Sequence, residues 1–357
     1  MKGSAIAFTG RGVIELVEIS LPQLGDEDVL VESELTAVSQ GTDRAMVTGS
    51  YAGVDDRYPF VYGYSRVGRV VEVGRAVTNV AVGDRVFVGM AGTRLDPRDG
   101  LGEQGGSYAS HGVVDQTEVV KLPAWVGDSV AALGAVAAIA YQGVVACDIK
   151  ARSRVLVAGL GAVGQFAVIF AALRGAQVWA ADPIAGRREL AARLSGAITV
   201  DPKEDVSTRV EETAWGSRPW RGRNGPPDSR YEQLRWRQAA GPLDVVIDAT
   251  GRGDAIDAYL PLLTREGCLC LQGYYSTPLA LDFHAAHMKR LAIRCPGGFD
   301  LVDYETVLRL TSSVDVSQLV GLEIPVADAP EMLHDLLLVN EAPPVAAVIR
   351  WRVEDEA

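Results

Sequence analysis

The feature that most constrains the fold is a glycine-rich hexapeptide in the middle of the chain. It reads Gly159-Leu160-Gly161-Ala162-Val163-Gly164. An apolar run, 154–158, precedes it, and a helix-forming run, 165–174, follows it. In such a strand–turn–helix the glycines permit a tight turn, close approach of a pyrophosphate to the backbone, and close packing of the helix on the strand. The helix N-terminus offers N–H groups and partial positive charge to phosphate. The pattern therefore predicts a dinucleotide site.

An acidic residue follows the next predicted strand. That strand covers Gln177–Ala181 and is followed by Asp182, 18 residues after Gly164. A carboxylate at about this spacing accepts hydrogen bonds from the ribose hydroxyls of a dinucleotide. It would also repel a 2′-phosphate, so the sequence favours NAD over NADP.

The rhythm of apolar segments changes at about residue 130. Before it, the chain reads as β-rich, with no alternation of strands and helices. The apolar runs predicted as strands there cover 29–32, 67–73, 85–88 and 113–122. After it, Ala-rich helical segments alternate with apolar runs, which indicates a parallel sheet covered on both faces. The strands predicted in that part cover 155–158, 177–181, 197–200, 245–248 and 268–272. The sequence thus predicts an α/β protein with a β-rich domain and a doubly wound domain.

Composition excludes several classes of protein. The chain has 357 residues, with 34 Lys plus Arg against 46 Asp plus Glu, giving a net charge of −12. A protein that binds nucleic acid needs a basic face, so we do not expect this acidic chain to bind nucleic acid. The four cysteines form no C-x-x-C pair, which argues against a disulfide framework and a zinc ribbon. We expect the cysteines to be reduced thiols, as in the cytoplasm. Arg11 and Glu15 interrupt the apolar stretch that a secretory signal would need, which also favours a cytoplasmic protein.

One uncharged stretch is long enough to raise the question of a membrane span. It covers 130–147, is rich in Ala and Gly, and contains Gln142. This composition favours a small-residue helix buried against a sheet, and we expect no membrane association.

Several motifs together resemble one family over almost the whole chain, the medium-chain dehydrogenase/reductases of the alcohol dehydrogenase superfamily. They are the 159–164 hexapeptide with Asp182, and the segments 63–74, 82–86, 105–109 and 244–251. The resemblance implies a GroES-like catalytic domain at residues 1–130, completed by 297–357. It implies a Rossmann NAD-binding domain at 131–296, which carries an insertion at about 211–241.

The positions at which that family binds zinc have other residues here. The C-x-[ST]-D-x-H stretch reads Gln40-Gly41-Thr42-Asp43-Arg44-Ala45, and the G-H-E stretch reads Gly63-Tyr64-Ser65. The segment that replaces the four-cysteine lobe, 89–104, has no cysteine. Tetrahedral zinc needs thiolate, imidazole or carboxylate donors, so no metal is predicted. Segments 39–44, 63–64, 273–275 and 281–283 further resemble a zinc-free branch similar to bacteriochlorophyllide a dehydrogenase.

Without a metal, hydrogen-bond donors must hold the reacting oxygen and a relay must move its proton. Thr42 matches the relay hydroxyl of the family, and Tyr64 stands where a zinc-binding His is found; both are predicted as catalytic. The alternatives are a turn-stabilising hydroxyl and a packed aromatic ring. The resemblance also implies cofactor contacts, with Arg187 at the adenosine ribose. The other predicted contacts are Val163, Thr250, Gly251, Gln272, Gly273 and Tyr274.

The sequence thus predicts a zinc-independent, NAD-dependent oxidoreductase that interconverts a secondary alcohol and a ketone. We expect a small-molecule substrate and a homodimer or homotetramer. One alternative is an NADPH-dependent quinone or enoyl reductase, against which Asp182 argues. Two others are a non-catalytic nucleotide-sensing or structural protein and an epimerase that holds NAD tightly.

Overall fold

The computed structural model describes residues 1–357 except 55–56, 90–92, 205, 214–240 and 353–357. Most of the predicted insertion at 211–241 therefore lies outside the described residues. The chain forms two compact units: Met1–Ala138 with Phe299–Ala357, and Ile139–Gly298. The sequence places the limits at 130–131 and 296–297 instead. The predicted limit at 130–131 lies inside one continuous helix, α2 (Asp128–Ala146).

The 139–298 unit is built on a parallel sheet. Its strand order is β12-β11-β10-β13-β14-β15 among the described residues. The strands are β10 (Arg154–Ala158), β11 (Gln177–Ala181), β12 (Ile198–Val200), β13 (Leu243–Asp248), β14 (Leu263–Leu271) and β15 (Ala292–Arg294). In chain order this is 3-2-1-4-5-6, the order of a Rossmann fold, and the direction of winding reverses between β10 and β13.

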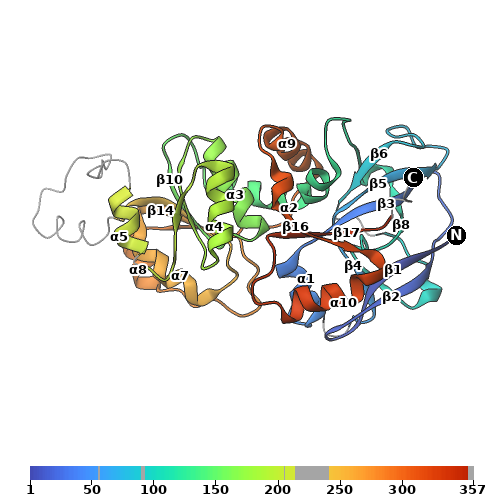
Figure 1. The fold of residues 1–357 in the computed structure, drawn as a ribbon, viewed down its shortest axis with the longest axis horizontal. Coiled ribbons are helices and arrows are strands. Elements are labelled where there is room, and N and C mark those ends of the chain that lie inside the picture. Colours follow the sequence, from blue (N-terminus) through green and yellow to red (C-terminus); the bar gives the residue numbers. More distant parts are fainter. Residues whose placement is uncertain (55–56, 90–92, 205, 214–240, 353–357) are drawn as a thin grey trace, which may run out of the picture. The chain divides into compact units, whose positions relative to one another are not determined.

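Helices cover this sheet. They are α3 (Ala162–Leu173), α4 (Ala185–Ser195), α5 (Val206–Thr213), α7 (Gly253–Tyr259) and α8 (Phe283–Lys289). Helix α3 packs against β10 and β11, α4 against β11 and β12, and α8 against β14 (Figure 1). The strands bury Leu156, Trp179, Val246 and Leu269 completely in one apolar core. Burial on both faces is the reason these strands are almost continuously apolar in sequence.

The unit formed by both chain ends is β-rich. One sheet has the order β2-β1-β4-β7, and the other β16-β17-β3-β5-β6-β9, with β8 paired to β3. Their bounds are β1 (Lys2–Gly10), β2 (Val13–Ser20), β3 (Asp28–Val38), β4 (Phe60–Tyr62), β5 (Arg66–Val73), β6 (Arg85–Val88), β7 (Gly102–Gln104), β8 (His111–Asp115), β9 (Val119–Lys121), β16 (Val320–Pro325) and β17 (Ala346–Arg350). Its helices include α1 (Gln40–Val47), α9 (Leu301–Thr311) and α10 (Ala329–His334). Strand β17 pairs with β3, so the C-terminal segment completes the N-terminal sheet.

The run 113–122 was predicted as one strand, and that prediction is wrong. The structure breaks it into β8 and β9 with a 3₁₀ turn, Gln116–Glu118, between them. Asp115 causes the break, because its side chain accepts a hydrogen bond from the backbone N–H of Thr117, 2.9 Å away. Such local side-chain bonds compete with strand pairing.

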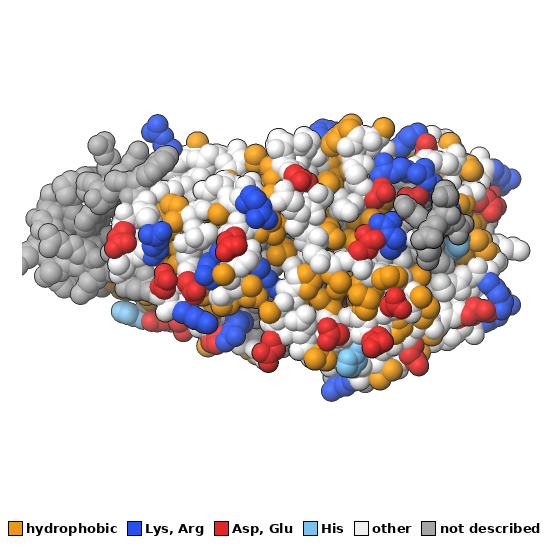
Figure 2. Space-filling model, viewed as in Figure 1, with side chains coloured by type: hydrophobic (Ala, Val, Ile, Leu, Met, Phe, Trp, Pro, Cys, Tyr) orange, Lys and Arg blue, Asp and Glu red, His pale blue; other side chains and the backbone are white. Residues whose placement is uncertain are grey.

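Helix α2 is the apolar segment noted in the sequence. By length and composition it could cross a membrane, but 61 % of its apolar stretch is buried within the protein. Core helices of soluble proteins share this property. On the face shown in Figure 2, acidic and basic side chains are interspersed over the described residues.

Candidate active site

The hexapeptide lies where the sheet reverses its winding, between β10 and α3. Gly159 has a φ of +85°, and a Cβ there would lie 2.9 Å from backbone atoms of Ala249 and Thr250. A Cβ on Gly164 would lie 1.8 Å from the carbonyl oxygen of Gly159. Gly161 differs, because nothing lies within 4 Å of its Cβ position, and it caps the N-terminus of α3. The first and third glycines are therefore required by packing, while the second leaves open space for a phosphate.

Asp182 follows β11 and is 3 % exposed. One carboxylate oxygen accepts a hydrogen bond from the backbone N–H of Leu160, and the other from that of Ile184, both at 2.8 Å. The Arg187 guanidinium lies 3.7 Å from the first oxygen. Asp182 thus fixes the glycine-rich loop, a role the sequence did not predict. Each carboxylate oxygen keeps a second lone pair, so the predicted ribose contact stays a prediction.

Two further residues that sequence reasoning missed support this loop. Arg188 donates to the backbone carbonyl of Asp182 at 2.6 Å and pairs with Asp201 at 3.0 Å. The fully buried Gln165 donates to the carbonyl of Arg187 at 2.8 Å. Val163 is half-buried in the first turn of α3. No local pattern marks Gln165 or Arg188, because their partners lie in other elements.

The carboxyl ends of β13 and β14 are joined by a second buried acid, Asp248. One of its side-chain oxygens accepts hydrogen bonds from the N–H and the hydroxyl of Thr250, at 3.0 and 2.7 Å. The other accepts the hydroxyl of Tyr275. The two glycines beside it pack closely, since a Cβ on Gly273 would lie 2.3 Å from the nitrogen of Gly251. The network holds the predicted cofactor residues of the two strands at one edge of the sheet.

Gln272 and Tyr274 also lie after β14, but the Gln272 side chain is engaged elsewhere. Its amide donates to the carbonyl of Ile139 in α2 at 2.5 Å. A Cβ on Gly143 would lie 2.0 Å from its side-chain oxygen, so Gln272 fills the place of a missing side chain. The carbonyl oxygen of Tyr274 would lie 2.7 Å from a Cβ on Gly251. In the structure Gln272 therefore packs between β14 and α2, and its predicted cofactor contact stays a prediction.

In the other unit, the two predicted catalytic residues belong to one hydroxyl cluster, Ser39, Thr42 and Tyr64. Thr42 lies in the first turn of α1, and Ser39 occupies the N-cap position of that helix without a side-chain capping hydrogen bond. The Ser39 hydroxyl lies 3.4 Å from the Thr42 hydroxyl, and both hydroxyls oppose the rise in the pKa of the neighbouring Tyr64 phenol. Burial, followed by the nearby Asp43 charge, raises the pKa of Tyr64, so the phenol keeps its proton. Sequence reasoning missed Ser39, although its spacing of three residues from Thr42 is the helical one.

Asp43 lies beside this cluster and is fully buried. One of its oxygens accepts the Tyr108 hydroxyl and, at 3.1 Å, the N–H of Ser39. Its other oxygen has no hydrogen-bond partner among the described residues. Desolvation raises the pKa of Asp43 to about 8, against the lowering effect of the two hydrogen bonds. The carboxyl is therefore protonated over much of the neutral range.

The positions that bind zinc in related enzymes are taken by side chains of other kinds. The Gln40 amide donates to the carbonyl of Pro344 at 2.8 Å, and the Ser65 hydroxyl to that of Ala132 at 2.5 Å. Ala45 has no donor atom. Among the described residues, no group of three His, Cys, Asp or Glu side chains could hold a metal. The residues present do not fit a zinc ligand set.

Comparison with known proteins identifies the family. Residues 25–124 match the alcohol dehydrogenase GroES-like domain, and residues 162–313 match the zinc-binding dehydrogenase family. An alcohol dehydrogenase of Rhizobium meliloti (strain 1021) is 32 % identical over 310 residues, covering 82 % of this chain and 83 % of its own. An L-threonine 3-dehydrogenase of Pyrococcus abyssi is 28 % identical over 287 residues, covering 76 % and 75 %.

Solved structures share the fold. An Escherichia coli oxidoreductase/dehydrogenase of unknown specificity has a TM-score of 0.80 at 18 % identity, covering 98 % of this chain and 99 % of its own. A Sinorhizobium meliloti 1021 dehydrogenase bound to NADP has a TM-score of 0.77 at 22 % identity, with the same coverage. The motifs, the 3-2-1-4-5-6 sheet and the relative of 32 % identity agree: the chain belongs to the medium-chain dehydrogenase/reductases of the alcohol dehydrogenase type and is an oxidoreductase of that superfamily.

Proposed function

We propose that this dehydrogenase interconverts a small secondary alcohol and its ketone, with NAD as the hydride carrier and without a catalytic zinc. The hydroxyl cluster of Ser39, Thr42 and Tyr64 supports the proposal, because Thr42 matches the proton-relay position of the family and Tyr64 the position of a zinc-binding His. The open space at Gly161 and the α3 N-terminus supports a bound dinucleotide.

In the direction of oxidation, the carbinol carbon loses a hydride, its hydroxyl loses a proton, and a C=O double bond forms. When bound, NAD would supply a nicotinamide ring as the hydride acceptor. Thr42 and Tyr64 hold the substrate oxygen through their hydroxyl groups, where negative charge develops. Thr42 accepts the substrate proton as it gives its own proton to the Ser39 hydroxyl, which passes one on to water, the final proton acceptor. Tyr64 acts as a neutral donor, since burial keeps its pKa high.

The choice of NAD is supported by Asp182. Its carboxylate lies at the end of the second strand of the unit, where it would oppose a 2′-phosphate. Arg187 and Arg188 beside it favour the alternative, an NADPH-dependent quinone or enoyl reductase, because guanidinium groups bind phosphate. The S. meliloti structure carries NADP.

The proposal is tested by binding and turnover with the full-length protein. Calorimetry with NAD and NADP separates the two cofactor choices, and tighter NADP binding would contradict the role of Asp182. Spectrophotometry with a panel of secondary alcohols, ketones, enones and quinones separates the two reactions. Turnover confined to enones or quinones would support the alternative. Cofactor that copurifies without turnover on any of these substrates would favour the epimerase or the nucleotide-sensing protein. We further propose a homodimer or homotetramer, which light scattering would measure.

A further inference from the structure

Three of the four cysteines belong to the 139–298 unit and interact with one another. Cys147 directly follows α2, and Cys268 and Cys270 lie in β14; all three are free thiols. The Sγ atoms of Cys147 and Cys268 are 3.0 Å apart, although the two residues are 121 positions apart in the chain. An S–S bond is about 2.05 Å long, so these two sulfurs would have to approach by only about 1 Å to be joined.

The backbone holds both members of this pair in place. The N–H of Cys147 donates to the carbonyl of Gly143 at 3.2 Å, which continues the hydrogen bonding of α2 by one residue. Cys268 is paired with Val245 of β13 on one side and with Ala292 of β15 on the other. The short distance between the two sulfurs is therefore set by regular secondary structure on both sides.

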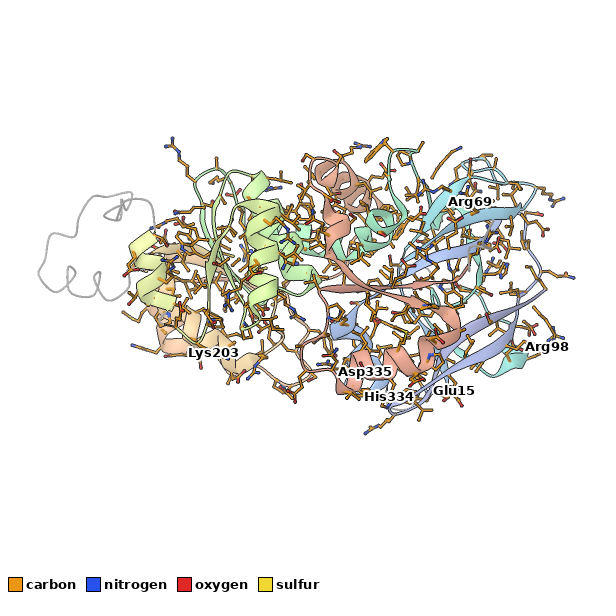
Figure 3. All side chains as sticks on the ribbon, in the orientation of Figure 1. Glu15, Arg69, Arg98, Lys203, His334 and Asp335 are labelled. Carbon is orange, nitrogen blue, oxygen red and sulfur yellow. The ribbon has the colours of Figure 1, made fainter. Side chains whose placement is uncertain are left out.

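Exposure determines which thiol a reagent meets first. Lys203, labelled in Figure 3, is an exposed side chain of the same unit. By comparison, Cys147 is 8 % exposed and Cys270 0 %, while Cys268 has an intermediate exposure. A small oxidant would therefore react with Cys268 first, and Cys147 is in position to react with it next.

The surroundings of the thiols keep them protonated. Cys268 lowers the pKa of Cys147, but Cys270 and burial raise it more, so that the pKa of Cys147 is raised overall. The pKa of Cys268 is raised by its hydrogen bond to Cys147 and by burial, which the charge of Arg294 opposes. Because the thiolate is the reactive form, the pair should stay reduced in the protein until a strong oxidant acts on it.

We propose that Cys147 and Cys268 form a reversible disulfide when the protein meets a hydroperoxide, which joins the end of α2 to β14. The hydroperoxide ROOH first transfers an oxygen atom to Cys268: the O–O bond breaks, an S–OH group forms, and ROH leaves. The Cys147 sulfur then attacks the Cys268 sulfur, the S–O bond breaks, and water leaves with the Cys147 proton. In total, two thiols and ROOH give a disulfide, ROH and water, and two electrons pass from sulfur to the peroxide oxygens.

This disulfide is independent of the proposed dehydrogenase reaction, because neither cysteine is a predicted cofactor or catalytic residue. It would join two elements that Gln272 already connects, through its hydrogen bond to the Ile139 carbonyl of α2 at 2.5 Å. A cross-link between residues 121 positions apart removes much conformational freedom from the unfolded chain. The oxidised protein should therefore be more stable than the reduced protein, and a thiol reductant should reverse the effect by exchange.

Peptide mapping of the full-length protein after treatment with hydrogen peroxide tests the site directly. With free thiols alkylated first, trypsin leaves Cys147 in the peptide 122–150 and both cysteines of β14 in the peptide 266–289. The oxidised wild type should give these two peptides joined, with the loss of two hydrogen atoms, and a reductant should separate them. Oxidation confined to the exposed Cys295, or the absence of the joined peptides, would overturn the proposal.

Single serine variants identify the partner of Cys147, because Cys268 and Cys270 share a tryptic peptide. Cys268→Ser should abolish the joined peptides, and so should Cys147→Ser, so that the failure of one variant to fold leaves the other. The matched control is Cys270→Ser, which removes a thiol from the same strand and should keep them. Persistence of the joined peptides in Cys268→Ser, or their loss in Cys270→Ser, would overturn the assignment.

Thermal unfolding gives a second readout that does not depend on activity. Oxidation should raise the Tm of the wild type and of Cys270→Ser by several degrees and leave that of Cys268→Ser unchanged. An equal rise in Cys268→Ser, or a Tm of the oxidised wild type no higher than that of the reduced protein, would contradict a stabilising disulfide at this pair. Because neither experiment uses turnover, its failure is distinguishable from failure of the proposed function.

Discussion

Two single substitutions can distinguish the roles of the second and third glycines of the hexapeptide, because the two glycines have different surroundings in the structure. In Gly164→Ala, the new Cβ would stand 1.8 Å from the Gly159 carbonyl oxygen, a contact that must lengthen by more than an ångström. Overpacking of this kind costs about 1–3 kcal/mol. For a unit of this size each kcal/mol lowers Tm by about 2–4 °C, so a decrease of about 2–12 °C is expected.

In Gly161→Ala, the new methyl group meets nothing within 4 Å, and the φ of −68° suits any residue. Stability should therefore change by less than about 1 kcal/mol, since loss of the cap preference and of chain entropy nearly cancel. The methyl group would instead occupy the space in which a pyrophosphate meets the backbone. We expect the Kd for NAD to rise at least about tenfold, which corresponds to about 1.4 kcal/mol.

Differential scanning calorimetry gives the Tm values, and titration calorimetry gives the NAD affinity. Gly297→Ala is a suitable control, because it also adds a methyl group in open space of the same unit and lies outside the hexapeptide. Wild-type NAD affinity in Gly161→Ala, or an equal loss of stability in Gly161→Ala and Gly164→Ala, would contradict these expectations.

Four other predictions concern the cofactor, the hydroxyl cluster, the metal and the buried acid. Asp182→Ser should narrow the preference for NAD over NADP, measured as the ratio of their Kd values in titration calorimetry. An unchanged ratio would contradict the role of Asp182 in cofactor choice. Thr42→Val and Tyr64→Phe should each lower kcat by about 10²–10³ without changing the Kd for NAD, as for the loss of a donor to developing negative charge; full activity of the double variant would leave the mechanism without its donors. Elemental analysis should find far less than one zinc per chain, and chelators should not lower activity; stoichiometric zinc would overturn this prediction. The folded-state pKa of Asp43 is raised to about 8 from an ordinary 3.8, so between these pH values the folded protein binds one more proton than the unfolded chain, and its free energy of unfolding decreases as pH rises through that window. Asp43→Asn should flatten this decrease in denaturant titrations from pH 4 to pH 8. An unchanged dependence of the unfolding free energy on pH would show that the carboxyl does not titrate there.

Much of the fold and half of the candidate site could be predicted from local patterns in the sequence. The hexapeptide is readable because turn, helix start and close packing all need glycine at fixed short spacings, and the structure places it between β10 and α3. The family motifs around Thr42 and Tyr64 likewise marked two residues that share a hydroxyl cluster. Short-range patterns suffice where the physical requirement is itself short-range.

Other features depend on contacts between residues far apart in the chain, and no local pattern encodes them. Asp182 reads as a strand-end acid, but the folded loop brings the Leu160 N–H to it, 22 positions away. The cofactor contact expected of Gln272 stays a prediction, whereas its hydrogen bond to Ile139 arises only in the folded chain, because Gly143 leaves room for the side chain. Arg66 begins β5 and is fully buried, and its Nη1 fills the place that a side chain on Gly112 of β8 would take. Burial and the partners of a polar atom are properties of the packed chain, since they arise only when distant elements come together.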